Sequence, residues 1–499
     1  MQRLSQKQQV IKIVTVTFSL LVLPLLLLTL AWLLPATAQQ AKHYTDLTFP
    51  TLPAVKLPKY TRFQLANGMV VYLMEDHELP LVDGSAFIRT GDRWEPATQV
   101  GVASLAGTVM RTGGTDTRSA DTINRFLEQQ AASVETGIGE TYGSAGFSAL
   151  AEDLEPVFQV FADVLQHPTF PQNQLTIEKT KLRGAIARRN DDPGGITSRE
   201  FQKLIYGQDN PYARTIEYTT LDNISREDLV RFYQQYYYPN NLILGIVGDF
   251  DSQKMRHLIE VAFQDWQPKP DLKVPPLPTV SPIAQGGVFL INQPQLTQSN
   301  IRMGHLGGQF DSPDFPALTV MNEVLNGFGG RLFNQVRSRQ GLAYSVYGTW
   351  DARFDYPGMF VAGGQTRSEA TVPFVQSLKV ELEKIRTAPV TETELKEAKD
   401  SVINSFVFNF QAPGQTLSRL LRYEYFGYPS DFIFRFQKGI EATTVADVQR
   451  VAKTYLTPDK MVILVVGNQA QIIPTLSSLT PNGQVSAVDI TIPPPAKKI

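Results

Sequence analysis

The pattern of apolar and polar positions alternates between short strand-like runs and longer helix-like runs. Phe63–Leu65 and Val70–Leu73 flank the Asn-Gly pair at 67–68, which predicts a β-hairpin. A further strand is predicted at Gly84–Arg89. Helical periodicity follows from about residue 101 and in four later stretches: Ala120–Ala132, Ala149–Leu165, Gln174–Arg189 and Arg226–Tyr236. This alternation favours an α+β fold.

A short apolar strand that ends in glycine occurs twice in the chain. It follows Pro239 and ends at Gly248, and it follows Pro458 and ends at Gly467, so that both pairs are 219 residues apart. Two helical segments about 215 residues apart also share their apolar spacing: Val102, Leu105, Ala106, Val109 and Met110 in the first, and Ala317, Val320, Met321, Val324, Leu325 and Phe328 in the second. A repeat of this length predicts a duplicated domain, because solenoid repeats are typically ~20–50 residues long.

The proline content divides the two halves. Six prolines fall between Gln267 and Gly287, and such a density disfavours helices and central strands, which predicts a linker. Each half is expected to be an α+β domain of about 200 residues, a mainly antiparallel sheet with helices packed on one face. The expected division is: 1–38 signal peptide or anchor, 39–57 N-terminal extension, 58–266 first domain, 267–287 linker, 288–475 second domain, and 476–499 C-terminal tail, whose proline-rich end we expect to be disordered.

The first 38 residues have the features of an export signal. Basic residues precede an uncharged, mostly apolar run from Ile13 to Pro35, and Ala36-Thr37-Ala38 follows, which predicts cleavage after Ala38. The run is 23 residues long, longer than the ~7–15 of a signal peptide and close to the ~20 that span a bilayer. An uncleaved membrane tether through residues 13–35 is therefore the alternative. Both readings predict an exported, periplasmic or otherwise extracytoplasmic protein.

Composition excludes several kinds of chemistry. The chain has 499 residues, with 46 Lys and Arg against 48 Asp and Glu, and therefore a net charge of −2. A near-neutral chain without a basic block gives no reason to expect a nucleic-acid partner. There is no cysteine, which excludes disulfides, thiolate metal sites and cysteine nucleophiles.

Three stretches of sequence resemble one enzyme family. They are Tyr238-Pro239-Asn240-Asn241 with the strand that ends at Gly248-Asp249, then Gly329-Gly330-Arg331-Leu332-Phe333, and Arg337–Ser345. Together they resemble the pitrilysin/insulinase family of zinc metallopeptidases, especially its short two-domain members, which are similar to mitochondrial processing peptidase subunits. The resemblance implies two homologous domains of the LuxS/mitochondrial-processing-peptidase-like metalloprotease type, whose half-shells enclose a chamber for unfolded peptides.

The metal motif of that family is degenerate in this chain. In the family, a helix carries His-x-x-Glu-His, whose histidines bind zinc and whose glutamate activates a zinc-bound water. Ser104 and Thr108 occupy the histidine positions and Gly107 the glutamate position. The third ligand, a glutamate, falls at Gly184 or Ala185. The resemblance therefore implies that this chain holds no zinc.

The remaining candidate ligands are scattered. The histidines are His43, His77, His167, His257 and His305, and no two lie within one helical turn. A ligand set assembled from distant positions remains the alternative, although neighbouring ligand pairs are the usual signature. Glu178 matches a family glutamate just before the missing ligand, and we interpret it as a structural or helix-surface carboxylate.

The second half keeps the other part of the family's site. Arg337 and Tyr344 match an arginine and a tyrosine that contact the metal-bound substrate in the family. A guanidinium and a phenol O–H can stabilise the negative charge that develops on a peptide carbonyl oxygen during attack. The alternative interpretation is structural: Arg337 as a solvated helix charge and Tyr344 as a half-buried strand aromatic.

The resemblance leads to two hypotheses of different classes. In the first, the chain is the non-zinc-binding subunit of a heterodimeric zinc metalloendopeptidase. It would supply Arg337 and Tyr344, while a homologous partner with His-x-x-Glu-His supplies the zinc and peptides are the substrates. In the second, it is a catalytically inactive peptide-binding or scaffold protein. A self-sufficient peptidase is the third and least favoured interpretation.

Overall fold

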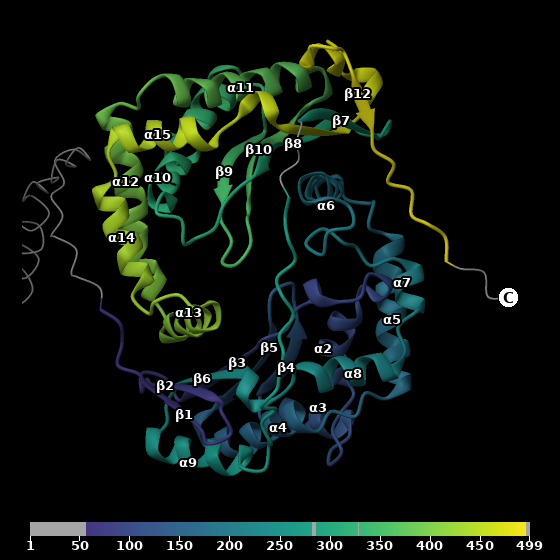
Figure 1. The fold of residues 1–499 in the computed structure, drawn as a ribbon, viewed down its shortest axis with the longest axis vertical. Helices are drawn as coiled ribbons and strands as arrows, with labels where there is room; N and C mark the ends of the chain where they lie inside the picture. Colours follow the sequence, from purple (N-terminus) through teal and green to yellow (C-terminus); the bar gives the residue numbers. More distant parts are fainter. Residues whose placement is uncertain (1–55, 282–285, 328, 496–499) are drawn as a thin grey trace, which may run out of the picture. The chain divides into compact units, whose positions relative to one another are not determined.

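The computed structural model describes residues 56–281, 286–327 and 329–495. The first half is built on a six-stranded sheet with strand order β1-β2-β6-β3-β5-β4 (Figure 1). Only the β2–β6 pair is parallel. The strands are β1 (Thr61–Gln64), β2 (Val70–Glu75), β3 (Leu81–Ile88), β4 (Ser133–Ile138), β5 (Gly143–Leu150) and β6 (Leu242–Gly248). The predicted hairpin is confirmed, because Phe63 lies opposite Val71 in the β1–β2 pair.

Alternation along the strands divides the side chains of this sheet between two faces. Val71 and Leu73 of β2 pack into the core beneath the helices of the first half. Tyr72 and Met74, between and after them, face the opposite way into a separate apolar cluster. The helices of this half are α2 (Val102–Thr112), α3 (Ala120–Gln129), α4 (Leu154–Gln166), α5 (Gln172–Ala187), α6 (Pro193–Tyr206), α7 (Tyr218–Asp222), α8 (Arg226–Tyr236) and α9 (Ser252–Phe263).

The second half repeats this architecture. Its sheet has the order β12-β7-β11-β8-β10-β9, so β11 holds the place that β6 holds in the first sheet. The strands are β7 (Gly287–Asn292), β8 (Gln298–Leu306), β9 (Ser345–Asp351), β10 (Met359–Arg367), β11 (Val462–Gly467) and β12 (Val485–Ala487). The helices are α10 (Phe315–Asn326), α11 (Thr371–Thr387), α12 (Glu392–Phe406), α13 (Pro413–Phe426), α14 (Phe432–Ala442) and α15 (Val445–Tyr455). The α+β class and the duplication predicted from the 219-residue spacing are confirmed.

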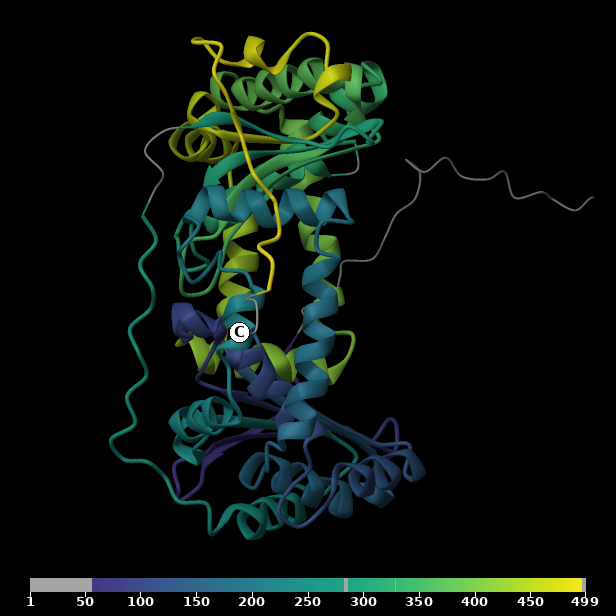
Figure 2. The ribbon, with the colours of Figure 1, turned by 90° about the vertical axis from the view of Figure 1, so that its right-hand side faces the viewer.

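Each sheet receives one helix from the other half of the chain. Helix α13 packs its leucines on the first sheet, and α6 packs on β8 and β11 of the second (Figures 1 and 2). Gly245 permits the close approach of α13, because a Cβ there would lie 2.7 Å from Leu421 Cδ1. Each sheet therefore has helices of its own half on one face, as the sequence predicted, and a helix of the other half on the opposite face.

The segments around the two halves are held by specific contacts. The described part of the linker, residues 267–281, contains no helix or strand and is bound to the first half. Trp94 Nε1 donates to Pro276 O at 3.2 Å and Asn210 Nδ2 to Thr279 O at 3.0 Å. Beyond residue 475, β12 pairs with β7, so the segment expected to be a tail adds an edge strand to the second sheet.

The predicted signal or anchor, residues 1–38, lies outside the described residues. Within 56–281, 286–327 and 329–495, no helix is long and apolar enough to cross a membrane.

Candidate functional site

Helix α2, which carries the positions of the degenerate motif, begins on a buried carboxylate. It follows Gly101, whose φ of 106° is a left-handed conformation that glycine adopts readily. Both carboxylate oxygens of Glu95 accept from the Gly101 N–H, at 3.1 and 3.0 Å, and one accepts from the Ala103 N–H at 2.6 Å. Glu95 therefore satisfies N–H groups that the first turn of a helix leaves without intrahelical partners.

The motif positions on α2 differ in their surroundings. Ser104 and Thr108, one helical turn apart, are both half-buried, whereas Gly107 is buried against β4. A Cβ at Gly107 would lie 2.5 Å from Ile138 N and 2.8 Å from Gly137 C, closer than real Cβ contacts. Thr136 Oγ1 also donates to Gly107 O at 2.6 Å, which ties the helix to the strand at this point. A glutamate side chain does not fit at position 107.

The third expected position, on α5, provides no ligand either. Ala185 is exposed and Gly184 is half-buried. Glu178, which precedes these positions on the same helix, is buried. Its carboxylate accepts a hydrogen bond from Gln174 Nε2 at 3.0 Å and pairs with Lys181 Nζ at 2.8 Å. These contacts give Glu178 a structural role. The residues at the motif positions therefore do not fit a zinc ion.

Three of the described histidines, His77, His167 and His305, form separate local contacts, and His257 is exposed. His77 is exposed and lies 2.6 Å from Asp249, and His167 lies 3.1 Å from Asp163. The His305 ring is bonded to Leu306 O, and burial lowers its pKa. No cluster of three or more histidine, aspartate or glutamate side chains in the described part of the chain could hold a metal ion. His43 lies outside that part.

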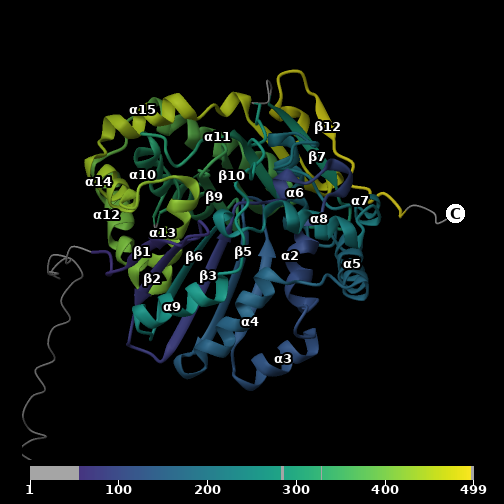
Figure 3. The same ribbon diagram turned by 60° about the horizontal axis from the view of Figure 1, so that its bottom comes forward.

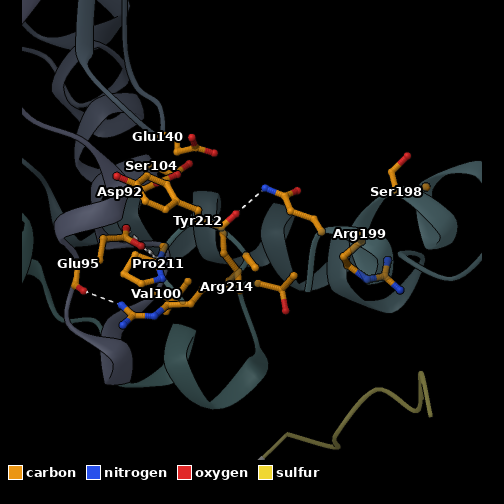
Figure 4. Close-up of a pocket in the computed structure, with 16 residues that line it drawn as sticks. Asp92, Glu95, Val100, Ser104, Glu140, Ser198, Arg199, Pro211, Tyr212 and Arg214 are labelled. Atoms are coloured by element: carbon orange, nitrogen blue, oxygen red, sulfur yellow. Dashed lines mark hydrogen bonds between the residues drawn. The ribbon is translucent and has the colours of Figure 1, made fainter. Parts of the chain in front are cut away.

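A cavity of about 420 Å³ opens beside the first turn of α2 (Figure 4). Its lining includes Asp92, Glu95, Ser104, Glu140, Arg199 and Tyr212. Burial raises the pKa of Glu95 to about 7, although the N–H groups of α2 oppose the shift. Burial and the neighbouring Glu140 raise the pKa of Asp92 to about 6. Carboxyl groups whose pKa lies this close to 7 are frequent in functional clefts and also in buried networks.

Two residues of the second half, Asp355 and Tyr356, contact residues in and beside this cavity. Arg93, whose side chain is 2% exposed, pairs with Asp355 at 2.8 Å. The rings of Tyr212 and Tyr356 stack with centroids 3.9 Å apart, and the Tyr356 hydroxyl hydrogen-bonds to Glu140. The sequence analysis missed these residues, because the Arg93–Asp355 pair spans both halves and leaves no local pattern.

Arg337 and Tyr344 lie on the second half, in and after a π-helical segment, Phe333–Arg339. The Arg337 guanidinium is exposed and lies over the Phe333 ring, 4.8 Å from its centroid. Tyr344 precedes β9 and is 74% exposed, so it is not the half-buried strand aromatic of the structural interpretation. Among the described residues, no hydrogen bond or ion pair joins either side chain to α2.

Comparison with known proteins agrees with this architecture. Residues 70–220 match the family model described as insulinase (peptidase family M16), and residues 223–402 match the model described as peptidase M16 inactive domain. The uncharacterized zinc protease YmxG of Bacillus subtilis (strain 168) is 24% identical over 365 residues, which is 72% of this chain and 86% of that protein.

Two solved structures share the fold. A peptidase M16 inactive domain from Pseudomonas fluorescens superposes with a TM-score of 0.73 at 24% identity, covering 83% of this chain and 100% of that one. The periplasmic protease PqqL from Escherichia coli superposes with a TM-score of 0.70 at 16% identity, covering 84% of this chain and 47% of that one. The two α+β halves of this chain thus share the fold of these structures. This chain belongs to peptidase family M16, the pitrilysin/insulinase family.

Proposed function

We propose that this protein is the non-zinc-binding subunit of an exported, heterodimeric zinc metalloendopeptidase. The observation that carries the proposal is the packing of Gly107 on β4, 2.5 Å from Ile138 N for any added Cβ. This packing leaves no space for the glutamate that the family uses as general base. A hydrolytic role then requires the metal and the base to come from a homologous chain with His-x-x-Glu-His.

Arg337 and Tyr344 are the residues that this chain would contribute. Their side chains are exposed, so they are free to approach a peptide held against a partner's zinc. As donors to the carbonyl oxygen of the scissile bond, each would stabilise the charge that appears there during attack. Removal of one such donor typically lowers kcat by about 10²–10³-fold.

The test uses the complex of this chain with a relative that carries the zinc motif. Turnover of an internally quenched peptide is measured for the wild type, Arg337→Ala and Tyr344→Phe. Arg339→Ala is the matched control, because Arg339 is an exposed arginine of the same π-helical segment. We expect kcat to fall about 100-fold in Arg337→Ala and Tyr344→Phe, with Arg339→Ala and complex assembly unchanged.

Assembly is checked by size-exclusion chromatography. A permanent pairing of two chains of this size should bury more than about 1,600 Å² in total. Full turnover in both Arg337→Ala and Tyr344→Phe would remove the catalytic role. Peptide binding by a chain that forms no complex with a zinc-bearing relative would instead favour the non-catalytic peptide-binding protein.

A further inference from the structure

A second cavity lies in the second half, on the side of α13 opposite the first sheet. It has a volume of about 610 Å³, within the ~300–1,000 Å³ typical of ligand pockets. Its walls are mainly aromatic, made by Phe310, Phe315, Phe354, Tyr423, Phe432 and Phe436. The rings pack against one another: Phe310 lies 4.7 Å from Phe354 and 4.9 Å from Phe315 between centroids. The wall is therefore a continuous surface for an apolar side chain.

Two arginines of α13 supply the charge of this cavity. Arg419 and Arg422 line it together with Gly414 and Gln415 of the first turn, and no acidic residue is among the described residues of its lining. Burial lowers the pKa of Arg419, and the positive charge of Arg422 lowers it further. The lining of this cavity thus brings two like charges together and includes no carboxylate. Arg422 also lines a neighbouring cavity of about 370 Å³, whose lining contains Glu140, Asp351 and Asp355.

The two guanidinium groups differ in their bonding. Arg419 donates to Asn409 O at 3.1 Å and to Asn409 Oδ1 at 2.7 Å. The Arg422 guanidinium has no hydrogen bond or ion pair within the described ranges, and its Nε is buried without a partner. A buried donor without an acceptor is costly. An anionic group in the cavity would supply that acceptor and would offset the repulsion between the two arginines.

The adjoining cavity limits where the anion can lie. It has a volume of about 670 Å³ and shares Phe310, Phe315 and Phe354 with the first, but its lining also contains Asp311 and Asp355. Asp355 is paired with Arg93. The negative end of a ligand would therefore bind beside Arg419 and Arg422, and its apolar part would extend along the shared aromatic wall.

We propose that this cavity binds the C-terminal end of a peptide, with the α-carboxylate on Arg422 and Arg419 and an aromatic or aliphatic last side chain against the phenylalanines. An arginine fork is suited to a carboxylate, because both oxygens can accept from it. The choice of a peptide over another apolar carboxylate rests on the proposed peptidase function. The site would add substrate selection to that function, because it would bind peptides by their free C-terminus.

The test measures binding of an N-terminally labelled octapeptide to the purified chain by fluorescence anisotropy. One peptide ends in Phe as the free acid, the second in Phe as the amide, and the third in Ser as the free acid. We expect the Phe acid to bind about tenfold or more tightly than the other two, as expected for loss of a charged hydrogen bond or of a buried ring. N-acetylphenylalanine and a medium-chain fatty acid serve as competitors, to separate a peptide terminus from other apolar carboxylates.

Variants then assign the effect to the cavity. Arg422→Met should bring the Phe acid to the affinity of the amide, and Arg422→Lys should restore part of the difference. Arg256→Met is the control, because Arg256 is an exposed arginine of α9 paired with Glu260. Equal affinity for acid and amide in the wild type, or an undiminished difference in a folded Arg422→Met, would overturn the proposal. Tighter binding of the fatty acid than of the Phe acid would also overturn it.

The outcome is separable from the proposed function. The kcat of the heterodimer on an amidated peptide depends on Arg337 and Tyr344 and not on Arg422. If Arg337→Ala lowers that kcat while acid and amide bind alike, the terminus site fails and the subunit role stands. If acid and amide differ while Arg337→Ala and Tyr344→Phe keep full kcat, the subunit role fails and the terminus site stands.

Discussion

The close packing of α2 on β4 can be tested by adding one methyl group. In Gly107→Ala, the new Cβ would lie 2.5 Å from Ile138 N and 2.8 Å from Gly137 C, which are backbone atoms that cannot rotate away. Overpacking of this kind costs about 1–3 kcal/mol, and the 2.6 Å hydrogen bond from Thr136 to Gly107 O is worth about 1 kcal/mol if the helix shifts. Alanine returns about 1 kcal/mol of helix propensity. We expect a net loss of about 2 kcal/mol in the free energy of unfolding.

Gly184→Ala is the matched control for this experiment. Gly184 also lies inside a helix, but the nearest atom to its added Cβ is Arg188 Nη1 at 3.7 Å, an ordinary contact. The free energy of unfolding of this variant should rise by about 0.5–1 kcal/mol. Urea titrations followed by circular dichroism and tryptophan fluorescence should separate the two variants by about 2–3 kcal/mol. A Gly107→Ala protein as stable as Gly184→Ala would refute the packing that excludes a glutamate from position 107.

Two further predictions concern the carboxyl groups beside α2. Because the pKa of Asp92 is raised to about 6 in the folded protein from 3.8, its contribution to stability is full below about pH 4 and is lost as the pH rises through 6. In urea titrations at pH 8, Asp92→Asn should therefore have a free energy of unfolding about 2–3 kcal/mol higher than that of the wild type. This difference should narrow at pH 5. A difference that does not change between pH 5 and pH 8 would contradict the prediction. Glu95→Ala should cost about 1–2 kcal/mol, because Gly101 and Ala103 lose their acceptor. Glu95→Gln keeps one acceptor and should therefore be destabilised less than Glu95→Ala in thermal denaturation. Equal destabilisation of the two variants would argue against the capping role.

Much of the fold could be predicted because its signals are local. The Asn-Gly turn and the flanking apolar runs specify the β1–β2 hairpin, and helix α8 has the predicted bounds, Arg226–Tyr236. The repeated apolar strands correctly indicated that β6 and β11 are equivalent. In each case the hydrophobic period and the residues that end the element agree with each other.

The errors occur where tertiary contacts decide. Strand β5 contains mainly small residues, which have weak strand propensity, and its end was predicted as the start of a helix at Ala149. Helix α6 opens with Pro193-Gly194-Gly195, a turn-like sequence, and was missed. It packs its apolar face on the second sheet, a contact between distant parts of the chain (Figure 3).

The sequence identified which residues occupy the motif positions of the candidate site, but it could not predict the contacts of those residues. The substitutions at Ser104, Gly107 and Thr108 are visible in the sequence, whereas the contact of Gly107 with the backbone of β4 requires the structure. The same holds for Glu95, which caps α2 from outside the helix, and for Arg93, whose partner Asp355 is in the other half.

The most direct test combines metal analysis with peptide hydrolysis on one preparation. The chain is purified alone in zinc-containing buffer, assayed for bound zinc and for cleavage of a quenched peptide, and assayed again after addition of a relative that bears His-x-x-Glu-His. The account predicts neither bound zinc nor cleavage for the chain alone, and cleavage by the complex that falls about 100-fold in Arg337→Ala. One equivalent of tightly bound zinc with turnover by the isolated chain would contradict it.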